Sequence, residues 1–216
     1  MLTVYLYYHK INQGDGMNRE IRIPKQNRSI EKKNKIIDAA YKIFNAKGYH
    51  NTTTAEIAKE AGIATGSVYA YFKDKKDIFI EALFKYNDII LEIIMKEFNQ
   101  INLEEDLSNV IKTMVNVLID CHNLSKNFHD EIMSLSFLEQ DIHTKLKIQN
   151  QKIINTILTQ LESKNILIQN SREKMFLILN VADSLCHELS YSSNYSLNKD
   201  IAINECVYMI KSLLLH

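Results

Sequence analysis

The chain has 216 residues, no net formal charge, and 46% hydrophobic and 24% charged residues, a composition typical of folded rather than disordered proteins. It holds only 5 Gly and 1 Pro, and neither occurs after Gly66. Sandwiches, barrels and doubly wound sheets need a turn residue about every dozen positions. This composition therefore excludes those folds and predicts an all-α protein.

Charge is unevenly distributed along the chain. Residues 17–76 hold 13 Lys/Arg and 6 Asp/Glu, whereas residues 77–216 hold 12 and 19. A basic N-terminal part on an acidic remainder suggests a unit that binds a polyanion, attached to a body with another task. The alternative is chance clustering of charges on a solvated face.

We predict no catalytic residue, no metal ligand, no cofactor and no membrane partner. No known zinc, phosphate-loop or nucleophile-elbow motif occurs, and no apolar run reaches the roughly 18–20 residues of a membrane span. His122 follows Cys121 and His187 follows Cys186, but neighbours on a helix point about 100° apart and cannot easily share one metal. With Cys206, these cysteines lie in apolar stretches, which is typical of reduced thiols in a cytoplasmic protein.

The first 28 residues lack a helical period and hold the single proline, so we expect residues 1–28 to be a flexible leader. The peptide Gln13-Gly14-Asp15-Gly16 can be encoded by purine-rich codons that resemble a ribosome-binding sequence just before Met17. We therefore expect either that translation begins at Met17, leaving residues 1–16 untranslated, or that a genuine short tail precedes it.

Helix signals follow in quick succession between residues 29 and 74. A helix is predicted from about Ser29, as N-cap, to Lys47, with Gly48 ending it in a left-handed conformation. Thr53 and Glu56 form a capping-box pattern for a short helix that Gly62 ends. A third short helix is predicted over about 65–72, after which Asp74 caps a fourth. Two short helices around a glycine corner are typical of a helix-turn-helix.

The second short helix is predicted to enter the major groove of DNA, which admits one α-helix. It carries hydroxyl and aromatic side chains and no acid, so it can donate hydrogen bonds to phosphates and bases. The alternative is a plain three-helix corner with a solvated basic face.

Four motifs in this region closely resemble the tetracycline-repressor-like (TetR) family of bacterial transcription regulators. They are Ile36-Ile37-Asp38-Ala39-Ala40, Phe44-Asn45-Ala46-Lys47-Gly48-Tyr49, Thr52-Thr53-Thr54-Ala55-Glu56-Ile57-Ala58-Lys59-Glu60-Ala61-Gly62-Ile63 and Gly66-Ser67-Val68-Tyr69-Ala70-Tyr71-Phe72-Lys73-Asp74-Lys75. The resemblance covers about residues 30–80. It implies an all-α homodimer with a helix-turn-helix DNA-binding domain over 29–74 and an effector-binding and dimerisation domain over 75–216.

The resemblance also implies which residues contact an operator. Thr53 and Thr54 would hold backbone phosphate, and Lys75 would clamp another. The residues implied to face the groove are Thr65, Gly66, Ser67, Tyr69 and Tyr71, of which the two tyrosines would also reach phosphate. Ala64 departs from the family, in which a Ser often caps this helix, so Thr65 is expected either to contact bases or to serve as the cap.

Beyond residue 74 the pattern predicts amphipathic helices at about 75–99, 104–123, 127–138, 140–163, 171–192 and 198–214. The last two are apolar on more than one face, so we expect a homodimer through them, with Val207 and Ile210 in the contact. An effector cavity could be lined by Tyr86, Ile90, Met114, Leu118, Cys121, Phe128, Met133, Phe137, Phe176, Asn180 and Asp183. For any one of them taken alone, ordinary core packing is the favoured interpretation.

Two functions remain open at this point. The first is a repressor that a small-molecule effector releases from a palindromic double-stranded DNA operator. The second is a DNA-binding module whose C-terminal body recruits a protein partner and binds no small molecule.

Overall fold

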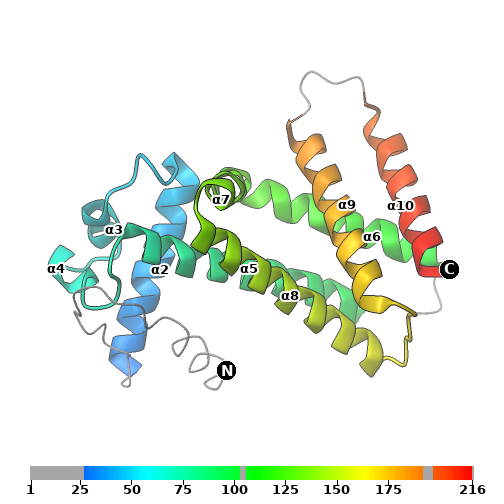
Figure 1. Ribbon diagram of the computed structural model, residues 1–216, viewed down its shortest axis with the longest axis horizontal. Coiled ribbons are helices and arrows are strands. Elements are labelled where there is room, and N and C mark those ends of the chain that lie inside the picture. Colours follow the sequence, from blue (N-terminus) through cyan, green and yellow to red (C-terminus); the bar gives the residue numbers. More distant parts are fainter. Residues whose placement is uncertain (1–26, 103–105, 192–196, 216) are drawn as a thin grey trace.

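The structure, a computed structural model, describes residues 27–102, 106–191 and 197–215. Within those ranges the chain forms nine helices and no strand, which confirms the predicted all-α fold (Figure 1). No helix among them is long and apolar enough to cross a membrane. The predicted leader, residues 1–28, lies outside the described residues except for its last two. Met17 and the residues before it also lie outside them.

Two of the helices are short and the rest are long. The short ones are α3 (Thr54–Glu60) and α4 (Thr65–Val68). The long ones are α2 (Asn27–Lys47), α5 (Lys75–Gln100), α6 (Leu107–Leu124), α7 (Lys126–Leu138), α8 (Gln140–Ser163), α9 (Ser171–Tyr191) and α10 (Lys199–Leu215). The helices from α5 onward begin and end within a few residues of the predicted limits.

Two predicted limits were wrong. Helix α2 already runs from Asn27, so Ser29 lies inside it and is not its N-cap; the Ser29 hydroxyl instead lies 3.2 Å from the Tyr71 hydroxyl. Helix α4 ends at Val68, four residues before the predicted end. Beyond it the chain continues in tight turns, in which the Tyr71 amide donates to the Val68 carbonyl at 2.9 Å.

Turn chemistry places the corners as predicted. Gly48 and Gly62 adopt φ angles of +82° and +65°, the left-handed conformation that glycine reaches without strain. Asn165 and Asn170 do the same between α8 and α9, with φ angles of +59° and +52°. In a region without glycine, asparagine is the residue that best tolerates this conformation.

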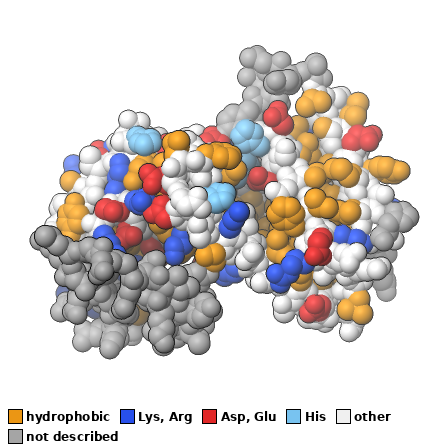
Figure 2. All heavy atoms as spheres, viewed as in Figure 1, with side chains coloured by type: hydrophobic (Ala, Val, Ile, Leu, Met, Phe, Trp, Pro, Cys, Tyr) orange, Lys and Arg blue, Asp and Glu red, His pale blue; other side chains and the backbone are white. Residues whose placement is uncertain are grey.

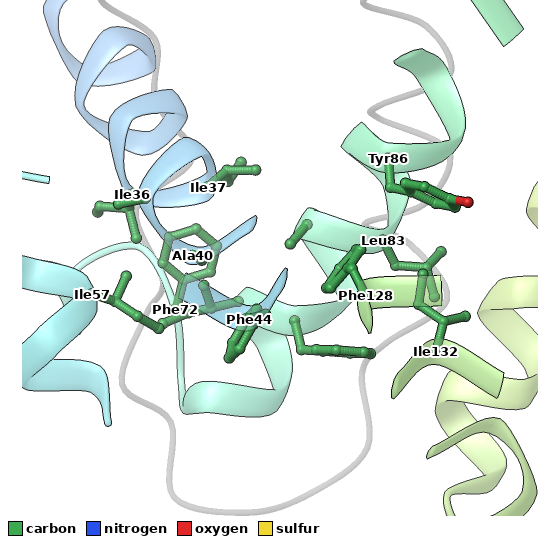
Figure 3. Packing of buried hydrophobic residues seen from close by; sticks show 14 of the residues in the cluster. Ile36, Ile37, Ala40, Phe44, Ile57, Phe72, Leu83, Tyr86, Phe128 and Ile132 are labelled. Atoms are coloured by element: carbon green, nitrogen blue, oxygen red, sulfur yellow. The ribbon is translucent and has the colours of Figure 1, made fainter. Parts of the chain in front are cut away.

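One hydrophobic core joins the short helices to the body. It is built around Phe44 of α2, Phe79 of α5 and Phe128 of α7, all fully buried, whose rings pack at centroid distances of 5.3–6.3 Å. Figure 3 shows the same cluster extending to Ile57 of α3. Helices α2 to α4 therefore share their core with α5 and α7, across the predicted domain boundary at residue 74.

A second core lies at the other end of the molecule, where α6 packs against α9 and α10. Its buried members include Val115 of α6, Cys186 of α9, and Cys206 and Val207 of α10. The three cysteines are reduced and buried. Figure 1 shows α9 and α10 at the end of the molecule opposite to α3 and α4.

Candidate nucleic-acid interface

The helix-turn-helix is held in place by small and branched side chains. Ile57 and Ala58 of α3 and Val68 of α4 are buried in the first core. The amide of Ile63 donates to the Ala58 carbonyl at 2.9 Å, which closes the end of α3 around Gly62. Helix α4 is therefore anchored by one side of a single turn, and its other side is free to face a partner.

That outer side carries most of the residues predicted to face DNA. Thr65, Gly66 and Ser67 are exposed, and 45% of the Tyr69 surface is accessible. Tyr71 differs, because it is half-buried against the first core with its hydroxyl beside Ser29. The structure thus groups four of the five predicted groove residues on one surface, and Tyr71 lies at its inner edge.

The start of α4 has no side-chain cap. Its N-cap is Ala64, which makes no side-chain hydrogen bond. Thr65 is the first residue of the helix and is not its cap. Of the two roles open to Thr65, capping is therefore excluded in this structure, and its exposed side chain remains available to a base or phosphate.

The start of α3 is closed by the predicted capping box. Glu56 accepts hydrogen bonds from the Thr53 amide and hydroxyl, both at 2.8 Å, and the Glu56 amide donates to the Thr53 hydroxyl oxygen at 3.3 Å. A hydrogen bond from Lys47 and those from Thr53 lower the pKa of Glu56 to about 2. The Thr53 hydroxyl is thus engaged within the protein, and Thr54 beside it is half-buried.

Lys75 ties the first turn of α5 to the loop before α3. Its ammonium donates to the carbonyl oxygens of Tyr49 at 2.7 Å and Thr52 at 2.8 Å, and it lies 4.2 Å from the centroid of the Tyr49 ring. Burial lowers the pKa of Lys75. An ammonium has three N–H bonds, so these two contacts leave one for the predicted phosphate.

Several lysines of the basic region are paired with acids, which the charge count does not reveal. Lys33 pairs with Glu81 at 2.8 Å, and Lys76 with Asp141 at 2.8 Å and Glu139 at 3.3 Å. Lys42 pairs with Glu60, and Lys47 with Glu56. Glu56 and Glu60 are already in the count for residues 17–76, but the partners of Lys33 and Lys76 are not, so these two lysines contribute less free positive charge than the sequence implies.

Comparisons with known proteins agree with this geometry. The family model for "Bacterial regulatory proteins, tetR family" matches residues 36–82. The chain is 30% identical over 150 residues to the IcaR negative transcriptional regulator of the biofilm operon icaADBC in Staphylococcus aureus, covering 61% of this chain and 81% of that protein. The chain belongs to the TetR family. The prediction of a DNA-binding transcriptional regulator, and not an enzyme, is confirmed at the level of this family.

Two further matches describe how far the similarity extends. The fatty acid metabolism regulator protein of Bacillus subtilis is 33% identical over 127 residues, or 58% of this chain and 65% of the relative, so the chain spans just under two thirds of that protein. A tetR-family transcriptional regulator from Streptomyces coelicolor superposes with a TM-score of 0.64 at 16% identity over 85% of this chain and 80% of its own. This second likeness shows a shared fold.

The residues predicted to line an effector cavity do not meet in one place in this TetR-family structure. Phe137 is 81% exposed and Phe176 is 55% exposed. Phe128 belongs to the first core, as does the half-buried Ile90, whereas Leu118 packs against the second core. Met114 and Met133 are half-buried on α6 and α7, and Asn180 is exposed on α9.

Three of the predicted lining residues, Tyr86, Cys121 and Asp183, do lie near one another. They surround His122 and His129, which sequence analysis did not predict to be in contact. The Tyr86 hydroxyl lies 3.4 Å from Nδ1 of His129, and Asp183 Oδ1 lies 3.9 Å from its Nε2. Cys121 precedes His122, whose ring centroid is 4.4 Å from that of His129. The seven-residue spacing of these histidines spans the joint between α6 and α7, so no helical period could reveal their contact.

Proposed function

We propose that this TetR-family chain is a homodimeric repressor that binds a palindromic operator through α4 and is released by an effector bound in its C-terminal body. The observation that carries the DNA-binding step is the surface of α4, where exposed Thr65, Gly66, Ser67 and Tyr69 surround a buried Val68. The fixed side of the helix sets its position, and the exposed side can present hydroxyl and aromatic groups to base edges. The name of the IcaR relative, a negative regulator, supports repression.

Helices α9 and α10 carry the dimer in this proposal. Ile201, Tyr208 and Leu215 are 60%, 73% and 64% exposed and recur every seven residues along α10. Phe176 and Leu177 of α9 are 55% and 48% exposed, and Figure 2 shows hydrophobic side chains gathered at the end of the molecule formed by these helices. Apolar patches of this kind mark interfaces. A twofold dimer would present two copies of α4 to a palindrome.

The predicted dimer contact needs one correction. Val207 and Ile210 are only 6% and 5% exposed, because they pack inside the chain's own second core. Their neighbours Tyr208 and Met209 are 73% and 46% exposed and replace them as candidate contacts. The surplus of apolar residues on α10 was correctly predicted, but the face turned outward was not.

A direct connection between the body and the DNA-binding helices supports release by an effector. Asn45 near the end of α2 accepts a hydrogen bond from the Phe128 amide through its side chain and one from Asn127 through its carbonyl, both at 3.1 Å. The Tyr41 hydroxyl bonds to that of Ser125. A shift of the first turn of α7 would therefore move α2, which carries α3 and α4 through the first core.

An operator selected from a random duplex library tests the DNA-binding step. We expect Ser67→Ala to lose about 1–3 kcal/mol of preference for the operator over a scrambled duplex, because a groove residue reads sequence. Lys75→Met is expected to weaken binding to both duplexes by the same factor, because a phosphate contact carries no sequence information. It should also reduce the slope of log affinity against log salt concentration by about one per chain. Fluorescence anisotropy at several salt concentrations measures both quantities. Equal binding of operator and scrambled DNA by the unmodified protein would refute the proposal.

The alternative, a body that recruits a protein partner, predicts a different behaviour. A ligand that binds only the native state raises the melting temperature, so a compound library that contains an effector yields thermal shifts together with loss of operator binding. A protein-recruiting body would show no such shift with any small molecule.

A further inference from the structure

The nitrogen Nε2 of His122 is buried without a hydrogen-bond partner. The residue is only 4% exposed and lies near the end of α6, where α7 and α9 converge on it. A buried polar atom without a partner is destabilising, so such an atom calls for an explanation, and a bound ligand is one.

Three side chains from three helices, His122 among them, come together at this place. His122 of α6, His129 of α7 and Asp183 of α9 each offer one ligand atom, and these atoms all lie within 4.8 Å of one another. A tetrahedral zinc ion with bonds of about 2.1 Å holds its ligand atoms about 3.4 Å apart. Small side-chain rotations are therefore sufficient to bring the three atoms onto one ion.

We propose that His122, His129 and Asp183 form a binding site for a divalent transition metal ion, for which zinc is the probe. Two imidazoles and a carboxylate suit zinc and its neighbours in the first transition row, whereas magnesium and calcium prefer oxygen ligands alone. The Asp183 side chain is 51% exposed and provides an entry path. His187 lies on the same face of α9, four residues on, with its ring 6.0 Å from that of His122.

The surroundings of the histidines fit this role. The Tyr86 hydroxyl lies 3.4 Å from Nδ1 of His129, which leaves the other nitrogen facing Asp183 and resembles the outer hydrogen bonds that orient metal-bound imidazoles.

The site is close to the contact between α7 and α2. His129 directly follows Phe128, whose amide donates to Asn45 of α2. An ion that draws His129 toward α6 and α9 would pull on this turn of α7. We therefore expect metal to lower operator affinity, a step that rests on the proposed repressor function, whereas metal binding itself does not.

Metal binding is tested on tag-free, reduced full-length protein by competition with a chromophoric chelator and by cobalt substitution. We expect one zinc per chain and a cobalt spectrum with ligand-field bands but no thiolate charge-transfer band. His129→Ala is expected to weaken zinc binding about 100-fold or more, and Asp183→Asn about tenfold or more. The control His143→Ala, on α8, should bind zinc like the unmodified protein.

The outcomes separate the two steps. Absence of zinc binding, equal binding by His129→Ala and the control, or a thiolate band from Cys121 or Cys186 would overturn the site. Loss of zinc binding in His122→Ala would not by itself identify a ligand, because this buried residue can be needed for folding. The half-exposed Asp183 therefore supplies the second variant. Zinc that binds at the site without changing operator affinity at least tenfold would overturn the coupling. Metal-free protein that binds no operator would refute the repressor function and leave the metal site standing.

Discussion

The first and second hydrophobic cores of this chain differ in how completely they are closed. In the first core 11 of the 18 buried members, Phe44, Phe79 and Phe128 among them, have no exposed surface, although the others retain up to 8%. In the second core every buried member retains 2–6%, and α10 also carries Tyr208, which is 73% exposed. Helices of this same chain cover the first core. The second core borders a surface that we propose is covered by a second copy of the chain. Core packing within one chain should therefore contribute most of the stability at the DNA-reading end, formed by α2–α4 and the first core. At the end formed by α9 and α10, stability should depend on association of two chains.

The largest expected effect is the loss of an aromatic ring from the first core. Phe44→Ala should lower the free energy of unfolding by about 3–5 kcal/mol, because the tightly packed rings around it cannot close the cavity. Ile203→Ala, in the second core where the isoleucine is 3% exposed, should cost about 2 kcal/mol, near the low end for such changes. Urea unfolding at one fixed protein concentration compares them, and equal losses would contradict the difference between the two regions.

A pair of adjacent substitutions on α10 separates folding from association. Val207→Glu places a charge inside the second core and should destabilise the fold by several kcal/mol. Tyr208→Glu changes an exposed position, so the chain should remain folded but sediment as a monomer. Circular dichroism and analytical ultracentrifugation of both variants provide the measurement. A dimeric Tyr208→Glu protein would place the interface elsewhere.

The smallest effect concerns the cap of α3. The pKa of Glu56 is lowered to about 2 in the folded state from 4.5, so its contribution to stability is present above pH 4.5 and is lost as the pH falls toward 2. We expect Glu56→Gln to lower the melting temperature at pH 6 and to match the unmodified protein near pH 2. Glu31→Gln, at an exposed position of α2, serves as the control. A difference that stays constant with pH would show that the carboxylate charge has no part in the cap.

Much of the DNA-reading end could be predicted because its signals are local. Gly48 and Gly62 mark left-handed corners, and Thr53 with Glu56 marks a helix start within four residues. The contacts of Lys75 with two carbonyl groups of a distant loop could not be predicted, since they depend on how α5 packs against that loop. The same holds for the paired lysines, whose partners lie on other helices.

The body was predicted in outline only. Its helix limits follow from apolar periodicity and from asparagine-rich joints, but two apolar faces on one helix do not reveal which of them turns inward. Val207 and Tyr208 illustrate this, since both are apolar neighbours and only the first is buried. The meeting of His122 with His129 and Asp183 depends on three helices at once, and no spacing in the sequence encodes it.

The central claim, that α4 enters the major groove, is tested most directly by Gly66→Ala. A Cβ at Gly66 would meet no atom within 4 Å in the free protein, and alanine favours a helix over glycine. We therefore predict an unchanged or slightly raised melting temperature together with an operator affinity at least about tenfold weaker, or roughly 1.4 kcal/mol. Gly62→Ala, at a φ of +65°, should instead lower stability by about 1 kcal/mol. Full operator affinity in a stable Gly66→Ala protein would contradict the docking of α4.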